Sequence, residues 1–119
     1  MKKLTPLAIA KQSAKMMWGK KAEDVVILNI SKLTTVSDYF VIGTVETNVQ
    51  MDAIIHAIKS DFRKQGLLQL ARQELKGSSP NWQLLDYGNV VVHVMTKSAR
   101  EFYSLERLWH KARKLSFRK

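Results

Sequence analysis

Apolar side chains recur at the spacing of an amphipathic helix in three stretches of the chain, which predict helices over 5–19, 47–66 and 98–115. Each stretch opens with residues typical of a helix start, namely Thr5-Pro6, Thr47 with Gln50, and Ser98 with Glu101. The predicted apolar faces are Leu7, Ala10, Ala14, Met17 and Trp18, then Met51, Ile54, Ile55, Ile58 and Phe62, and then Phe102, Leu105, Leu108, Trp109, Ala112 and Leu115. Residues 116–119 are expected to fray.

Short runs rich in β-branched residues lie between the helices and predict strands over 25–30, 38–44, 82–87 and 90–95. Gly88-Asn89 is a turn signal that should pair the last two strands as a hairpin. Valine on both faces of 90–95 predicts a central strand that is covered on both sides. The stretch 67–76 fits either a further strand or additional helix, and its periodicity does not decide between them.

The order of these elements indicates an α+β fold, with a mixed β-sheet of four to five strands and helices packed on it. A chain of 119 residues with 45% hydrophobic content is long enough for one packed domain, so we predict a single domain over 1–119. The chain has no cysteine, which excludes disulfides and thiolate metal sites. Its apolar runs are far shorter than the roughly 20 residues that cross a bilayer, so no membrane span is expected.

The amino end carries lysines and an apolar stretch, which raises the question of a targeting peptide. Lys11 and Lys15 interrupt the apolar run that a secretory signal needs. A mitochondrial presequence is normally rich in arginine, and the first 20 residues contain none. We therefore predict a cytoplasmic location, with the mitochondrial matrix as the alternative.

The formal net charge of +10 is the strongest compositional signal, because polyanions are common partners of small basic domains. Most of the basic residues are lysines, which suit diffuse contact with a phosphate backbone better than bidentate contact with base edges. A solvated lysine surface that only confers solubility explains the composition equally well.

No pattern typical of a catalytic site occurs. The chain lacks the Asp-x-Asp or Asp-x-Glu pair of two-metal phosphoryl transfer and the spacing of a Walker loop, and Ser78-Ser79 is not a nucleophile elbow. His56, His93 and His110 fall on separate elements without metal-ligand spacing. We therefore predict no enzyme activity, metal or cofactor, and we interpret His93 as a hydrogen-bonded core or surface histidine.

The strand 82–87 carries two large aromatic residues and an acid, a combination typical of binding hot spots. The alternation of a strand predicts that Trp82 and Leu84 point into the core while Leu85 and Tyr87 face outward. Exposed aromatics on this hairpin would also support a homodimer, which the sequence leaves open.

Four blocks of sequence stand out along the chain, namely DYFVIGT at 38–44, Gln50 with Ala53-Ile54, WQLLDYGNVVVH at 82–93 and REFYSLERLW at 100–109. In this order they resemble the signature blocks of the ribosomal silencing factor (Iojap) family. The resemblance implies a fold related to nucleotidyltransferases but without their catalytic acids. It also implies binding to ribosomal protein fourteen of the large subunit, which sterically blocks joining of the small subunit and lowers translation when nutrients fail. Related organellar proteins assist large-subunit assembly, and a basic RNA-binding module is a further alternative.

The resemblance places the partner-binding surface on two neighbouring elements. The residues that it implies are Trp82, Leu85, Asp86, Tyr87, Arg100, Tyr103 and Glu106. Family members usually have a Glu-Gly pair before the tryptophan, whereas Glu74 is followed by Leu75 here. Family members also tend to be acidic, and this chain is +10. We therefore expect Asp86 and Glu106 to form an acidic patch within a basic, lysine-rich surface that also contacts ribosomal RNA.

Overall fold

The computed structural model describes residues 4–70, 80–103 and 110–117, with the backbone alone described at 102–103. Its elements are α1 (Pro6–Gly19), β1 (Glu23–Asn29), β2 (Tyr39–Val45), α2 (Asn48–Lys64), β3 (Trp82–Asp86), β4 (Val90–Thr96), α3 (Lys97–Tyr103) and β5 (Arg113–Leu115). The strands form one sheet in the order β3-β4-β2-β1-β5. β2 and β4 run parallel and the other neighbours antiparallel, so the predicted α+β fold with a mixed sheet is confirmed.

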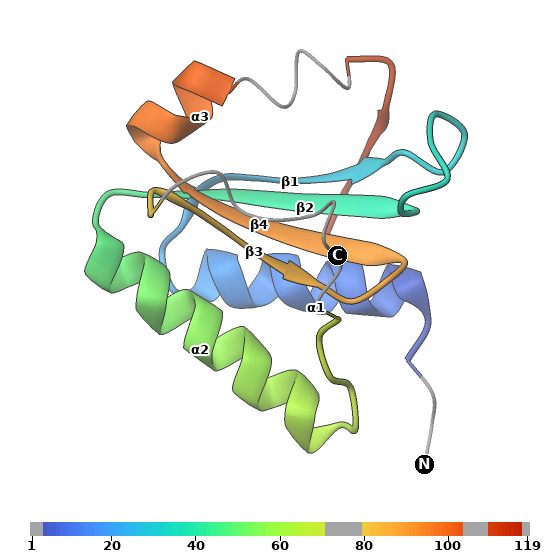
Figure 1. Cartoon of the computed structure of the whole chain (residues 1–119), viewed down its shortest axis with the longest axis horizontal. Coiled ribbons are helices and arrows are strands. Elements are labelled where there is room, and N and C mark those ends of the chain that lie inside the picture. Colours follow the sequence, from blue (N-terminus) through green and yellow to red (C-terminus); the bar gives the residue numbers. More distant parts are fainter. Residues whose placement is uncertain (1–3, 71–79, 104–109, 118–119) are drawn as a thin grey trace.

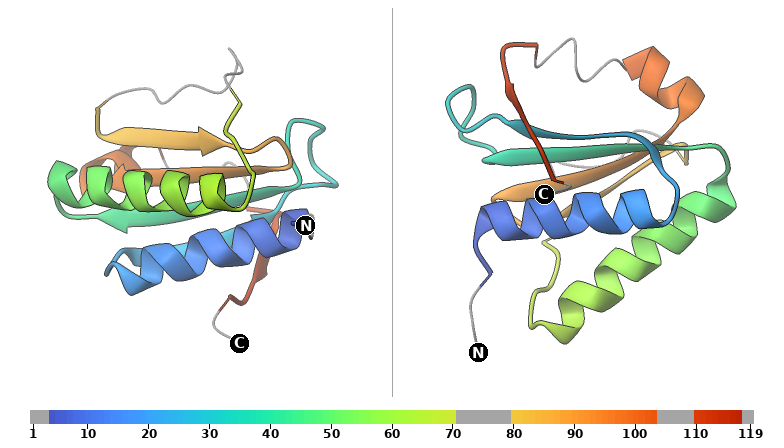
Figure 2. Two further views of the ribbon diagram at one scale, coloured as in Figure 1. Left: turned by 90° about the horizontal axis from the view of Figure 1, so that it is seen from below. Right: turned by 180° about the vertical axis from the view of Figure 1, so that it is seen from behind.

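Two helices cover one face of the sheet and the short third helix lies over the other face (Figures 1 and 2). We call these the α1/α2 face and the α3 face. β4 lies between β3 and β2, and all seven of its residues are buried. The prediction of a central strand covered on both sides is therefore confirmed.

The α1/α2 face holds the larger apolar core. Threonine side chains cap both helices, since Thr5 Oγ1 accepts from the Ala8 amide and Thr47 Oγ1 from the Gln50 amide, each at 3.1 Å. The buried residues of these helices include Ala10, Ala14, Met17, Met51, Ile54, Ile58 and Phe62. Helical periodicity at these positions therefore predicted the α1/α2 core correctly.

The α3 face carries a smaller cluster of apolar side chains. Its buried members are Leu28, Ile30, Phe40, Ile42, Val91, Met95 and Ala99. Among the side chains of α3 that the structure describes, residues 97–101, Ala99 is the one that belongs to this cluster.

The predicted third helix over 98–115 begins within one residue of its predicted start, but its predicted cap and its carboxyl end are wrong. α3 begins at Lys97, and Thr96 Oγ1 accepts from the Ala99 amide at 3.3 Å, so Thr96 occupies the position predicted for Ser98. Arg113–Leu115 forms β5, in which Leu115 pairs with Ile27 of β1. The predicted positions 105, 108 and 109 lie outside the described residues. A strand forms at 113–115 because pairing satisfies backbone groups along the edge of β1.

Two aromatic residues are placed differently from the prediction. Trp18, assigned to the apolar face of the first helix, has 49% of its surface exposed. Phe117, in the tail expected to fray, is buried and packs edge-on against Trp18 with ring centroids 6.4 Å apart. α1 instead meets the sheet through small residues and Met17, whose Sδ would lie 2.6 Å from a Cβ added at Gly43. This close approach leaves no room between α1 and the sheet for a large ring.

None of the helices in the described part of the chain is long and apolar enough to span a membrane. Of the stretch 67–76, whose structure the sequence left open, residues 67–70 are described. Leu70 forms an isolated antiparallel bridge with Asp86, in which its amide donates to the Asp86 carbonyl oxygen at 2.6 Å.

Candidate docking site

The candidate site residues of the hairpin lie on strand β3 and on the turn that follows it. β3 pairs with β4 in antiparallel register, Trp82 opposite Met95 and Asp86 opposite Val91. Trp82 and Leu84 pack with the apolar cluster of the α3 face, whereas Leu85 and Tyr87 belong to the core of the α1/α2 face. The site residues are thus divided between the two faces of the sheet.

The predicted orientation of Leu85 and Tyr87 is wrong. Leu85 is 2% exposed and Tyr87 8% exposed, and the Tyr87 ring lies edge-on to Phe62 of α2 at a centroid distance of 5.1 Å. Trp82 is half-buried. Alternation along the strand was predicted correctly, but the deeper face is the one that α2 covers.

Asp86 also lies inside the protein, at 2% exposed. Its Oδ1 accepts a hydrogen bond from the Gly88 amide at 2.8 Å, which supports the turn between β3 and β4. Gly88 has a φ of 84°, a conformation that favours glycine. The expected acidic patch therefore lacks Asp86, whose carboxylate holds the turn, and Glu106 lies outside the described residues.

Trp82 is oriented by a histidine on the neighbouring strand. Its Nε1 donates to His93 Nδ1 at 3.1 Å, and the His93 ring packs edge-on against Phe40 at a centroid distance of 4.6 Å. Burial lowers the pKa of His93 to about 3, so the ring is neutral at physiological pH. With Nδ1 as acceptor, the proton lies on Nε2, which has no hydrogen-bond partner among the described residues. The interpretation of His93 as a hydrogen-bonded core histidine is confirmed.

Arg100 of α3 reaches the same end of the sheet as Trp82. Its Nη1 donates to Thr44 Oγ1 at 2.7 Å. Met95 pairs with Thr44 on one side and with Trp82 on the other, so the three residues lie side by side across the strands. The structure therefore brings Trp82 and Arg100 together on the α3 face. Tyr103 is the last described residue of α3.

Opposite charges gather around the start of α3. The Lys97 ammonium lies 3.4 Å from Glu23 Oε2 and 3.6 Å from Glu46 Oε1. A hydrogen bond and the charge of Glu23, with a smaller contribution from Glu46, raise the pKa of Lys97. These two carboxylates provide acidic character near α3 on an otherwise basic chain.

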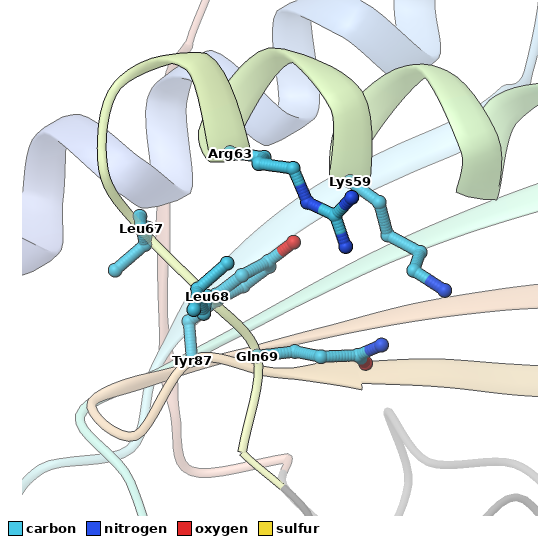
Figure 3. A pocket seen from close by; sticks show the side chains of 6 residues that line it. All are labelled: Lys59, Arg63, Leu67, Leu68, Gln69 and Tyr87. Atoms are coloured by element: carbon cyan, nitrogen blue, oxygen red, sulfur yellow. The ribbon is translucent and has the colours of Figure 1, made fainter.

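A hollow of about 230 Å³ lies beside Tyr87 (Figure 3). Tyr87 and Trp82 pack on opposite faces of the sheet. Lys59 and Arg63 of α2 border it, together with residues 67–69. Sequence reasoning assigned no role to Lys59 and Arg63. Their spacing of four residues on the polar side of the second helix was a usable signal, but it does not show that Tyr87 lies next to them.

Comparison with known proteins gives one consistent family. The family model described as ribosomal silencing factor during starvation matches residues 3–119. The ribosomal silencing factor of Halalkalibacterium halodurans is 41% identical over 91 residues, which cover 76% of this chain and 75% of that protein. The ribosomal silencing factor of Bacillus subtilis is 36% identical over 102 residues, which cover 86% of this chain and 85% of that protein. A crystal structure of a Chromobacterium violaceum protein has a TM-score of 0.80 and 28% identity, covering 98% of this chain and 94% of that chain.

Proposed function

Because this chain belongs to the ribosomal silencing factor family, as the match over 3–119 shows, we propose that it represses translation by binding the large ribosomal subunit. The mechanism is steric. No bond is made or broken, and a protein surface of ordinary size covers the place where the small subunit would join. We place this activity in the cytoplasm, since the two silencing factors compared above are bacterial proteins.

The partner in this proposal is protein fourteen of the large subunit, and the contact lies on the α3 face at the end of β3. The observation that carries it is the half-buried Trp82, whose indole is held by the hydrogen bond to His93. A large aromatic side chain that is already oriented loses little conformational entropy when it binds, which makes it a suitable anchor. Arg100 lies close by, and Tyr103 and Glu106 follow it in the chain.

The buried residues of the hairpin take a supporting role in this proposal. Leu85 and Tyr87 attach β3 to the α1/α2 core, and Asp86 holds the turn. These residues affect the proposed contact with the ribosomal protein indirectly, because they fix the position of β3. Acidic character on this side comes from Glu23 and Glu46 beside α3, and lysines elsewhere on the basic surface contact ribosomal RNA.

Sedimentation with purified large subunits tests the proposed contact. Trp82→Ala should weaken binding at least about tenfold, or about 1.4 kcal/mol, because it removes the aromatic anchor. Trp18→Ala is the matched control, because Trp18 is a tryptophan with 49% of its surface exposed that lies on α1. A thermal melt of each variant separates loss of the contact from loss of the fold.

The same preparations show which step is affected. Wild-type protein should sediment with free large subunits and reduce the yield of complete ribosomes when small subunits are added. Equal binding by wild type and Trp82→Ala would contradict the docking site. Binding without any effect on subunit joining would favour the alternative role in large-subunit assembly, and recovery on bare RNA alone would favour a basic RNA-binding module.

A further inference from the structure

Lys59 and Arg63 lie about one helical turn apart on α2 and border two adjoining hollows. The first hollow, of about 230 Å³, is also lined by Tyr87 and by residues 67–69. The second, of about 240 Å³, is lined in addition by His56 and Ser60. Because the two hollows share Lys59 and Arg63, we describe them together as the α2 groove.

The polar groups of the α2 groove are hydrogen-bond donors that converge on the same space. Figure 3 shows the Tyr87 hydroxyl directed into the hollow that Arg63 and Lys59 border, with the Gln69 amide below it. In the part of the chain that the structure describes, no carboxylate lines either hollow. Among the described residues, neither Lys59 nor Arg63 has a carboxylate within salt-bridge distance. The α2 groove therefore has the donors and the charge to bind an anion.

Tyr87 gives this groove a fixed donor. Its ring is packed against Phe62 and is 8% exposed, whereas its hydroxyl has no hydrogen-bond partner among the described residues. Burial raises the pKa of Tyr87 to about 12, so the hydroxyl keeps its proton throughout the physiological range. A buried ring that presents its hydroxyl to a basic hollow can therefore donate a hydrogen bond to a ligand in that hollow.

We propose that the α2 groove binds the phosphate backbone of RNA, with Lys59 and Arg63 supplying charge and the Tyr87 hydroxyl a hydrogen bond. The choice of RNA rests on the proposed function, in which the chain binds a ribosomal subunit. Two basic hollows in a row suit a polymer that repeats its anion. The Tyr87 ring is buried, so it offers no face on which a base could stack, and the groove reads phosphates rather than sequence.

The α2 groove and the Trp82 region lie on opposite faces of the sheet. A protein contact through Trp82 would therefore leave the groove open to RNA. The net charge of +10 does not fit a contact with a basic ribosomal protein. It does fit the RNA contact of the α2 groove, which a positive charge strengthens.

Fluorescence anisotropy with a labelled single-stranded RNA oligonucleotide, titrated at several salt concentrations, tests the inference. The double variant Lys59→Ala/Arg63→Ala should bind about tenfold more weakly. Its slope of log affinity on log salt should fall by about 1.4, since each phosphate contact with a single strand contributes about 0.7. Tyr87→Phe keeps the ring and should bind about fivefold more weakly with an unchanged slope, because the hydroxyl carries no charge.

The matched control is Lys15→Ala/Lys32→Ala, which removes the same charge from two exposed lysines outside the groove. It should lose less than about twofold in affinity. Equal losses in the two double variants would overturn the inference, because diffuse charge would then explain binding. Competition by polyglutamate as strong as that by unlabelled RNA would assign the groove to an acidic protein instead. Displacement by inorganic phosphate at equal phosphate concentration would assign it to a small phosphate ligand.

The titration uses RNA without ribosomes, so the two proposals can fail separately. Wild-type protein that binds the oligonucleotide through the groove but does not sediment with large subunits would contradict the proposed function and leave the groove in place. A Lys59→Ala/Arg63→Ala variant that binds the oligonucleotide as tightly as wild type would contradict the α2 groove as the RNA-binding site, whatever the result of the sedimentation experiment.

Discussion

The two faces of the sheet are built differently. The α1/α2 face is covered by helices of 14 and 17 residues over a continuous apolar core. The α3 face is covered by a helix of seven residues, and polar pairs lie within its apolar cluster, Trp82 with His93 and Arg100 with Thr44. Apolar packing is tolerant and strongly stabilising, whereas buried hydrogen bonds depend on geometry. We infer that the α1/α2 face supplies most of the stability and the α3 face the precise placement of the candidate docking residues.

The largest effect should come from the α1/α2 core. Phe62→Ala removes a fully buried ring that contacts Tyr87, and it should lower the free energy of unfolding by about 3 to 5 kcal/mol. Denaturant unfolding followed by circular dichroism measures the change. Val49→Ala on the same helix is the control, since Val49 is 81% exposed and should change stability by less than about 0.5 kcal/mol. A loss below about 1 kcal/mol for Phe62→Ala would show that this core is not the main source of stability.

The α3 face should be the part of the molecule that is sensitive to acid. The pKa of His93 is about 3 when folded, against 6.5 in the unfolded chain, so the unfolded state takes up a proton first as the pH falls. The contribution of the neutral His93 ring to the free energy of unfolding is therefore complete above pH 6.5 and is lost as the pH falls toward 3. From this residue alone, the free energy of unfolding should be about 2 kcal/mol lower at pH 5 than at pH 7.

A double variant tests whether the loss of stability between pH 7 and pH 5 comes from the Trp82–His93 pair. Trp82→Phe/His93→Leu removes both hydrogen-bonding partners and keeps apolar side chains, so the loss between pH 7 and pH 5 should shrink by about 2 kcal/mol. His56→Gln is the control, because His56 is exposed on α2. If His56→Gln reduces the pH dependence and the double variant does not, the buried histidine is not the acid-sensitive group.

The agreement between sequence and structure follows the range of the interactions. α1, α2 and the β3–β4 hairpin depend on caps, helical periodicity and the Gly88 turn, all of which act within a few residues. β5 depends on pairing with β1, far away in the chain, and its residues also fit a helical period. Local patterns could not identify it.

The candidate site was harder to predict for a related reason. Alternation shows that neighbouring residues of β3 point to opposite faces of the sheet. Which of the two sets is buried depends on the face that α2 covers, and alternation does not show this. Leu85 and Tyr87 therefore changed from expected contacts to core residues, whereas Trp82 is partly buried against the apolar cluster of the α3 face. The same inward turn places the Tyr87 hydroxyl beside Lys59 and Arg63, which only the three-dimensional arrangement could show.

Asp86 allows a smaller test of the geometry on which β3 depends. Asp86→Ala deprives the Gly88 amide of an acceptor at 2.8 Å and should cost about 1 to 2 kcal/mol of stability. Asp86→Asn keeps an oxygen at that position and should lose less than half as much. Thermal unfolding of the two variants makes the comparison. Equal losses would mean that the charge of Asp86 matters more than its hydrogen bond to the turn.

The smallest effect compares the helix caps of the two faces. Thr47→Ala removes the cap of α2, which packs on the main core and should open only with the whole protein, so global stability should fall by about 1 kcal/mol. Thr96→Ala removes the cap of α3, whose described side chains contribute one buried apolar residue, Ala99, to the cluster beneath it. Its amides should exchange about fivefold faster with solvent through local opening, while the unfolding midpoint moves less than for Thr47→Ala. If Thr96→Ala instead lowers the midpoint as much as Thr47→Ala, α3 unfolds together with the main core. The two faces would then form one cooperative unit, and the α3 face could not adjust to a partner independently of the rest of the protein.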